Sequence, residues 1–74
     1  MQTITHYLNP KYEFIELMKL LKFQQIAQTG GHAKILIEDG EISVNGEVEY
    51  RKRKKLRDGD VVKFEDIEVK IEKG

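Results

Sequence analysis

The chain has 74 residues, no cysteine and a formal net charge of zero, with thirteen Lys and Arg against thirteen Asp and Glu. A domain of this length buries only about 60% of the surface that its unfolded chain exposes, and without cysteine it has neither disulfides nor thiolate ligands for zinc. An elaborate enclosed active site, a disulfide scaffold and a cysteine-based zinc site are therefore excluded.

The first residues alternate loosely in the segment QTITHYL, residues 2–8, and are rich in β-branched and aromatic types. This pattern predicts a short strand before a turn at Asn9-Pro10. The same segment lacks the basic start and the continuous apolar stretch of a signal peptide. Because no apolar run in the chain approaches the roughly 20 residues that span a bilayer, we expect a cytoplasmic protein with no membrane partner.

Two short helices are predicted next. The apolar positions of the first follow the i, i+3, i+4, i+7 spacing of an amphipathic helix: Phe14, Leu17, Met18 and Leu21. We expect this helix to end between residues 23 and 26. Thr29 then offers a hydroxyl N-cap to a second helix, which should stop at Gly40, a residue suited to the left-handed position after a helix.

Beyond residue 40 the hydrophobic period changes from 3.6 to 2. Apolar residues alternate around Asn45-Gly46, which are strong hairpin-turn residues. A two-residue loop would set Val44 opposite Glu47, whereas a three-residue loop would set Val44 opposite Val48 and keep apolar partners together. We therefore favour the three-residue loop.

The C-terminal part contains two further strand patterns. Asp58-Gly59 predicts a turn, and strands are expected at residues 61–64 and 67–71, with a turn between them. The order indicates an α+β fold in which two short helices pack on a small antiparallel sheet, with the segment 2–8 as an optional N-terminal strand. Since no repeat or linker separates a second unit, we expect residues 1–74 to form one domain.

The basic residues are concentrated in one segment. Six of the thirteen cations lie between Arg51 and Arg57, which leaves seven cations against thirteen carboxylates in the other 67 residues, a formal balance of minus six. Such a distribution steers a polyanion onto one face, although a solvated turn without a ligand has the same composition. Leu56 is interpreted as an apolar anchor that directs the flanking cations outward.

The segment QTGGHAK, residues 28–34, is a second candidate for anion binding. Two glycines open a helix whose first N–H groups lack partners within the helix, so a phosphate can approach the backbone closely. Lys34, about one turn later, can add a charge-assisted contact. A flexible helix start beside a solvated lysine explains the same residues.

The run TGGHAKILIEDGEISVNGEVEYRKRKKLRDGD, residues 29–60, resembles the S-four (alpha-L) RNA-binding domain, a module named after a ribosomal protein. The similarity rests on Ala33-Lys34 and on the segments IEDG, ISVNG and GDVV, and with the leucine-rich first helix it covers about residues 14–64. The form TGGxAK is similar to small bacterial proteins that consist of this domain alone. The chain therefore resembles a stand-alone member.

Two departures from the family pattern are visible. Many members open the first helix with Arg-Leu-Asp, where this chain has Glu16-Leu17-Met18. They open the second with Ser-Arg or Thr-Arg, where this chain has Thr29-Gly30. One phosphate-binding arginine of the family is therefore absent, and we expect Lys22 and the segment 51–57 to supply the charge.

The resemblance implies a non-catalytic protein that recognises the shape and phosphates of structured RNA, either ribosomal or transfer RNA. Ribosomal particles or their assembly intermediates are the expected targets. No cofactor or metal is expected, and the oligomeric state is left open, with a monomer as the default. The residues expected on the RNA-binding surface are Lys22, Thr29, Gly31, His32, Lys34, Arg51, Lys52, Arg53, Lys54 and Lys55.

Three rival classes can be weighed from the residues. An enzyme is disfavoured, since only His6 and His32 could act as imidazole bases and no paired nucleophile or metal-ligand spacing accompanies them. A small protein-binding adaptor that presents an open edge of its final strands is the main alternative. Binding to anionic lipid would need an amphipathic basic helix, which the segment 51–57 does not resemble.

Overall fold

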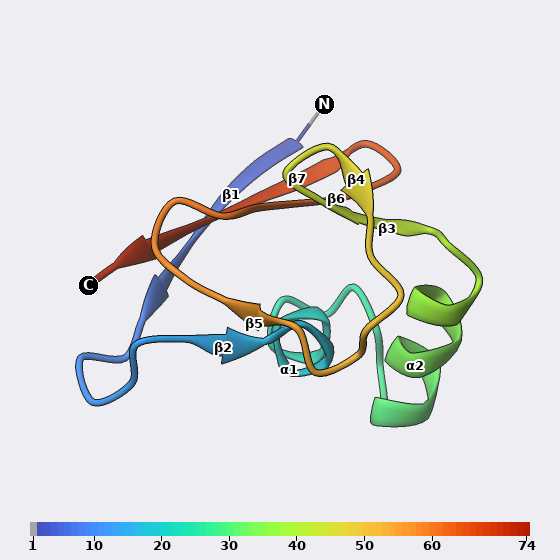
Figure 1. The fold of residues 1–74 in the computed structure, drawn as a ribbon, viewed down its shortest axis with the longest axis horizontal. Coiled ribbons are helices and arrows are strands. Elements are labelled where there is room, and N and C mark those ends of the chain that lie inside the picture. The colour runs from blue at the N-terminus through green and yellow to red at the C-terminus, as the bar shows by residue number, and fades with distance from the viewer. Residues whose placement is uncertain (1) are drawn as a thin grey trace.

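The computed structural model describes residues 2–74, in which a sheet forms one layer and two helices with a small two-stranded ribbon form the other (Figure 1). The helices are α1 (Leu17–Phe23) and α2 (Gly30–Glu38). The strands are β1 (Gln2–Leu8), β2 (Ile15–Glu16), β3 (Ile42–Val44), β4 (Glu47–Val48), β5 (Lys55–Leu56), β6 (Val61–Phe64) and β7 (Ile67–Lys73).

The main sheet has five strands in the order β1-β7-β6-β3-β4. The predicted N-terminal strand is present, and it pairs in parallel with the C-terminal strand, from Gln2 opposite Ile67 to Leu8 opposite Lys73. All other neighbours are antiparallel. The α+β prediction is confirmed, but the sheet is mixed and not antiparallel throughout. The first and last strands of the chain, β1 and β7, pair in parallel, and all the other elements lie between them in the sequence.

This topology changes which strands have open edges. Within residues 2–74, β6 and β7 are each paired on both sides, so the edges of the sheet are β1 and β4. The expectation that the final strands present an open edge is therefore wrong. The expectation failed because the sequence pattern of residues 2–8 predicts a strand but does not show which strand it pairs with.

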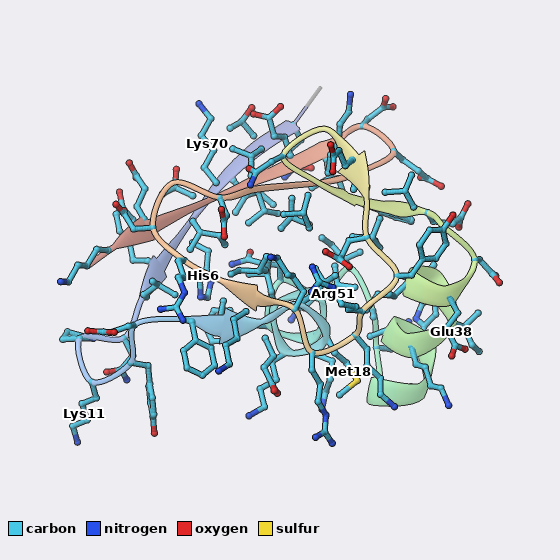
Figure 2. All side chains as sticks on the ribbon, in the orientation of Figure 1. His6, Lys11, Met18, Glu38, Arg51 and Lys70 are labelled. Atoms are coloured by element: carbon cyan, nitrogen blue, oxygen red, sulfur yellow. The ribbon has the colours of Figure 1, made fainter. Side chains whose placement is uncertain are left out.

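The core lies between the sheet and the helix layer. Alternate residues of each strand face inward: His6 of β1 points toward the helices in Figure 2, while Lys70 of β7 points away. The side chains that are essentially inaccessible to solvent come from both layers, namely Leu17, Leu20, Leu21, Ile37, Ile42, Leu56, Val62, Val69 and Ile71. Neither helix in the described residues is long and apolar enough to cross a bilayer.

The first helix begins three residues later than predicted. Phe14 lies outside it, and Ile15–Glu16 form β2, which pairs with β5 through Ile15 opposite Leu56. The helical spacing of Phe14 was therefore coincidental. Backbone pairing with a segment about forty residues away overrides the local periodicity, as tertiary contacts often override propensity.

The hairpin between β3 and β4 has a two-residue loop. Val44 lies opposite Glu47, so the prediction of a three-residue loop is wrong. Asn45 and Gly46 both have positive φ, at 54° and 87°, which is the geometry of the tight turn that Asn-Gly favours. Apolar matching did not set the register because β4 is an edge strand whose two residues are both exposed.

The second helix starts and ends as predicted. Thr29 has extended backbone geometry, and its Oγ1 accepts a hydrogen bond from the N–H of His32 at 3.0 Å. After the helix, Gly40 adopts a φ of +76°, and the ring of Tyr50 lies so close that a Cβ there would come within 3.3 Å of the Tyr50 hydroxyl. Gly40 therefore serves both helix termination and close packing.

Candidate nucleic-acid interface

The basic segment forms an exposed loop whose backbone is fixed to the first helix. The carbonyl of Lys54 accepts from the N–H of Leu17 at 2.9 Å, and that of Lys52 accepts from the N–H of Met18 at 3.0 Å. These are two of the N–H groups at the start of α1 that have no partner within the helix. The loop thus caps α1 with its backbone and leaves its side chains free to face solvent.

Leu56 holds the other end of this loop. Its side chain is fully buried, and Lys55 and Arg57 on either side are exposed. The prediction that Leu56 anchors the segment is confirmed. Burying one leucine is worth about 2 kcal/mol, so the position of the neighbouring cations is set by the core.

Five consecutive basic residues, Arg51 to Lys55, line an open depression of about 560 Å³. Four of the five are exposed and Lys54 is partly buried. An open concave surface lined by cations fits a rounded polyanion better than a small molecule, which usually needs an enclosed and mostly apolar pocket. The geometry therefore suits a nucleic-acid backbone.

Arg51 is partly engaged by an acidic neighbour that was not singled out in the sequence. Its Nε lies 3.0 Å from Oε2 of Glu49 and its Nη2 lies 3.1 Å from Oε1. Hydrogen bonds from the guanidinium lower the pKa of Glu49 below its ordinary value, and Arg51 and Lys54 add favourable charge interactions. The arginine is therefore less available to a phosphate than Lys52 or Arg53.

The start of α2 brings together Thr29, Gly31 and His32. The Nδ1 atom of His32 accepts from the N–H of Gln28 at 3.2 Å, so in the neutral ring the proton is on Nε2, which can donate outward. A Cβ added at Gly30 would meet nothing within 4 Å, and one at Gly31 would meet only the Thr29 hydroxyl at 3.9 Å. The surface above these glycines is open.

The remaining predicted lysines lie on the two helices. Lys22 is exposed near the end of α1 and lines a depression of about 430 Å³ with Gln25, Ala27 and Gln28. Lys34 is exposed on α2. The loop contacts the start of α1 and Lys22 lies near its end, so the loop cations and Lys22 lie toward different ends of this helix.

The opposite face of the sheet has a different charge pattern. On this face Lys63 of β6 lies opposite Glu68 of β7, and Lys70 and Glu72 follow two and four residues later along β7. Mixed charges of this kind do not attract a polyanion. The concentration of cations is thus confined to the loop and helix side of the molecule.

The histidines and carboxylates of residues 2–74 do not form a metal-binding cluster. No three His, Cys, Asp or Glu side chains in that range are arranged to hold a metal ion. His6 is buried on β1 with its Nδ1 3.0 Å from Nε2 of Gln24, and its ring packs edge-on against Phe23 with centroids 4.9 Å apart. His6 is therefore part of the packing between β1 and α1.

Comparison with known protein families gives a match over most of the chain. A family model described as the S4 domain matches residues 8–72, which is wider than the region of resemblance deduced from the sequence. The chain is 39% identical over 61 residues to YbcJ of Escherichia coli (strain K12), which is named as a candidate RNA-binding protein, with 82% of this chain and 87% of that protein covered.

A second relative and a solved structure agree with this match. The chain is 42% identical over 53 residues to RlbA of Bacillus subtilis (strain 168), named as a probable ribosome maturation protein, with 72% and 75% of the two chains covered. The solution structure of E. coli YbcJ, described as revealing an αL motif involved in RNA binding, superposes with a TM-score of 0.62 at 36% identity. That comparison covers 97% of this chain and 87% of the other.

Proposed function

The chain belongs to the S4 domain family, and from this we propose that it is a non-catalytic RNA-binding protein that recognises structured RNA. The RNA proposed is ribosomal RNA, free or within assembly intermediates of the ribosome. The name of the B. subtilis relative supports a ribosomal target over transfer RNA. The proposed contacts are the ten residues predicted from the sequence.

The observation that carries the proposal is the loop of residues 51–55. Five consecutive cations line one open depression, and the backbone beneath them is hydrogen-bonded to α1. A surface fixed in this way before binding loses little conformational entropy when the ligand arrives. The loop is thus suited to phosphates at defined positions, which a solvated and mobile turn is not.

The mechanism follows from the shape of A-form RNA. Its major groove is deep and narrow, so side chains contact mainly phosphates and 2′-hydroxyls. We infer that the loop cations bind one stretch of backbone while Lys22, Lys34 and the open start of α2 bind another. This arrangement selects RNA by the spacing of its phosphates and gives modest sequence specificity.

The proposal is tested by equilibrium binding to a ribosomal RNA hairpin and to a DNA duplex of equal length over a series of salt concentrations. If about five phosphates are neutralised, the logarithm of the binding constant should fall with the logarithm of salt at a slope near −4. We expect tighter binding to RNA than to DNA. Affinity that is equal for both, or independent of salt, would contradict the proposal and favour a protein-binding adaptor.

A further inference from the structure

A second depression lies next to the basic loop and contains none of the residues assigned above. It has a volume of about 410 Å³ and is lined by Tyr12, Phe14, Ile15, Glu16 and Lys19. Tyr12 is 63% exposed and Phe14 is partly buried. Phe14 is not among the partly buried residues that pack against the core, so the packing of the core does not account for its ring.

Two cations lie over the Phe14 ring. The Nζ of Lys55 is 5.0 Å from the ring centroid and the Cζ of Arg57 is 5.6 Å from it. The pairing of Ile15 with the buried Leu56 explains this geometry. Phe14, Lys55 and Arg57 are the neighbours of this pair along the two strands, and successive side chains of a strand point to opposite faces, so these three share the outward face. The cation–π contacts hold both side chains at the aromatic surface.

This second surface is continuous with the basic loop. Lys55 lines the first depression, and its Nζ contacts the ring of Phe14, which lines the second. The backbone bonds from Leu17 and Met18 to the loop fix the start of α1, which directly follows β2, against the same segment. An RNA strand held along the loop would therefore lead directly onto the ribbon of β2 and β5, seen below the sheet in Figure 1.

We propose that this surface, Tyr12 and Phe14 with Lys55 and Arg57, binds an unpaired nucleotide next to the RNA helix that the loop holds. The base stacks on an aromatic ring, which every nucleobase can do, and the adjoining phosphate lies at the two cations. Of the residues that line the second depression, Glu16 carries a carboxylate, and Lys19 lies 3.9 Å from it and offsets its charge. Arg57 also lines a neighbouring depression with Glu13 and Asp58. The inference rests on the proposed function, since it needs a bound RNA.

The test compares a blunt RNA hairpin with the same hairpin carrying a three-nucleotide overhang, at the 5′ end or at the 3′ end, that contains 2-aminopurine. For the wild-type protein we expect one of the two overhangs to tighten binding at least about five-fold, which corresponds to the lower end of the affinity gain from one stacked base. We also expect stacking to quench the fluorescence of the 2-aminopurine in that overhang. Phe14→Leu combined with Tyr12→Leu should abolish both effects and leave affinity for the blunt hairpin unchanged.

Two further variants keep the result interpretable. Phe14→Tyr retains an aromatic face and should preserve the gain from the overhang. Tyr7→Leu removes another exposed tyrosine, on β1, and should have no effect. If the wild type binds the blunt hairpin but gains nothing from either overhang, the inference is overturned while the proposed function stands. If it binds no hairpin at all, the proposed function itself fails.

Discussion

The guanidinium group of Arg51 donates two hydrogen bonds to the carboxylate of Glu49, from Nε at 3.0 Å and from Nη2 at 3.1 Å. A third comes from the Arg51 backbone N–H, also at 3.0 Å. The side chain of Glu49 is 14% exposed, whereas that of Arg51 is 71% exposed, so the pair lies at the surface. An acidic residue thus occupies two of the five guanidinium donors of the first cation in the proposed RNA-binding loop.

The substitution Glu49→Gln should therefore strengthen RNA binding. It weakens the hydrogen bonds that hold the Arg51 guanidinium, because a neutral amide has one acceptor oxygen, and it removes a negative charge that a phosphate would otherwise face. Exposed ion pairs are worth up to about 1 kcal/mol, so we expect affinity to rise about two- to five-fold in a fluorescence anisotropy titration. The control is Glu72→Gln, which removes an exposed carboxylate from β7. Equal gains in both variants would show only an effect of net charge.

Alanine at Gly30 and Gly31 should separate binding from folding. Space is available for both methyl groups and neither residue has a positive φ, so we expect unfolding stability to be unchanged or raised by up to about 1 kcal/mol. RNA affinity should nevertheless fall if a phosphate approaches this backbone.

The control for the glycine pair is Gly59→Ala, measured by urea unfolding beside the RNA titration. Gly59 has open space around it but a φ of +93°, so this change should cost about 1 kcal/mol of stability. Full RNA affinity in the Gly30→Ala, Gly31→Ala protein would mean that the start of α2 does not contact RNA.

The stability of the fold should fall below neutral pH because of His6. Burial lowers the pKa of His6 below its ordinary value of 6.5. As pH falls from about 6.5 through the lowered pKa, the unfolded chain takes up a proton that the folded protein resists, so the free energy of unfolding decreases. The hydrogen bond between Gln24 Nε2 and His6 Nδ1 also requires an unprotonated Nδ1.

Urea unfolding of His6→Gln at several pH values from about 7.5 to 5 checks this prediction. The variant should lose the part of the pH dependence that the wild type shows in this range. The exposed His32 provides the control, and His32→Gln should keep it. An identical pH profile for the wild type and His6→Gln would rule out His6 as the source.

Leu56→Ala tests the anchor of the basic loop. Leu56 is fully buried in the core, and such truncations cost about 2–5 kcal/mol. The exposed Val48 serves as control, since Val48→Ala should change stability by less than about 0.5 kcal/mol. A Leu56→Ala protein as stable as the wild type would mean that the loop is not held by the core.

Features with a strong local cause were predictable from the sequence. The strand at residues 2–8, the Thr29 cap and the left-handed Gly40 each follow from residue types within a few positions. The concentration of cations and the anchoring role of Leu56 were also visible as a pattern. The hairpin register was missed, because apolar matching was preferred over the turn geometry of Asn45-Gly46.

Features that depend on distant contacts were not predictable. The parallel partner of β1 and the pairing of β2 with β5 join segments far apart in the sequence. The capping of α1 by carbonyls of Lys52 and Lys54 leaves no side-chain signal. The cations over Phe14 depend on the pairing of β2 with β5, and they were not predicted because Phe14 was expected to lie in the first helix.

The most direct test of the account replaces Arg51, Arg53, Lys54 and Lys55 with Gln and measures binding to a ribosomal RNA hairpin across a salt series. The matched control replaces Lys11, Lys63, Lys70 and Lys73, four exposed lysines outside the proposed site, so both proteins lose the same charge. We predict that the loop variant loses most of its affinity and salt dependence while the control stays within a few-fold of the wild type. Equal losses in the two variants would contradict a defined phosphate-binding loop.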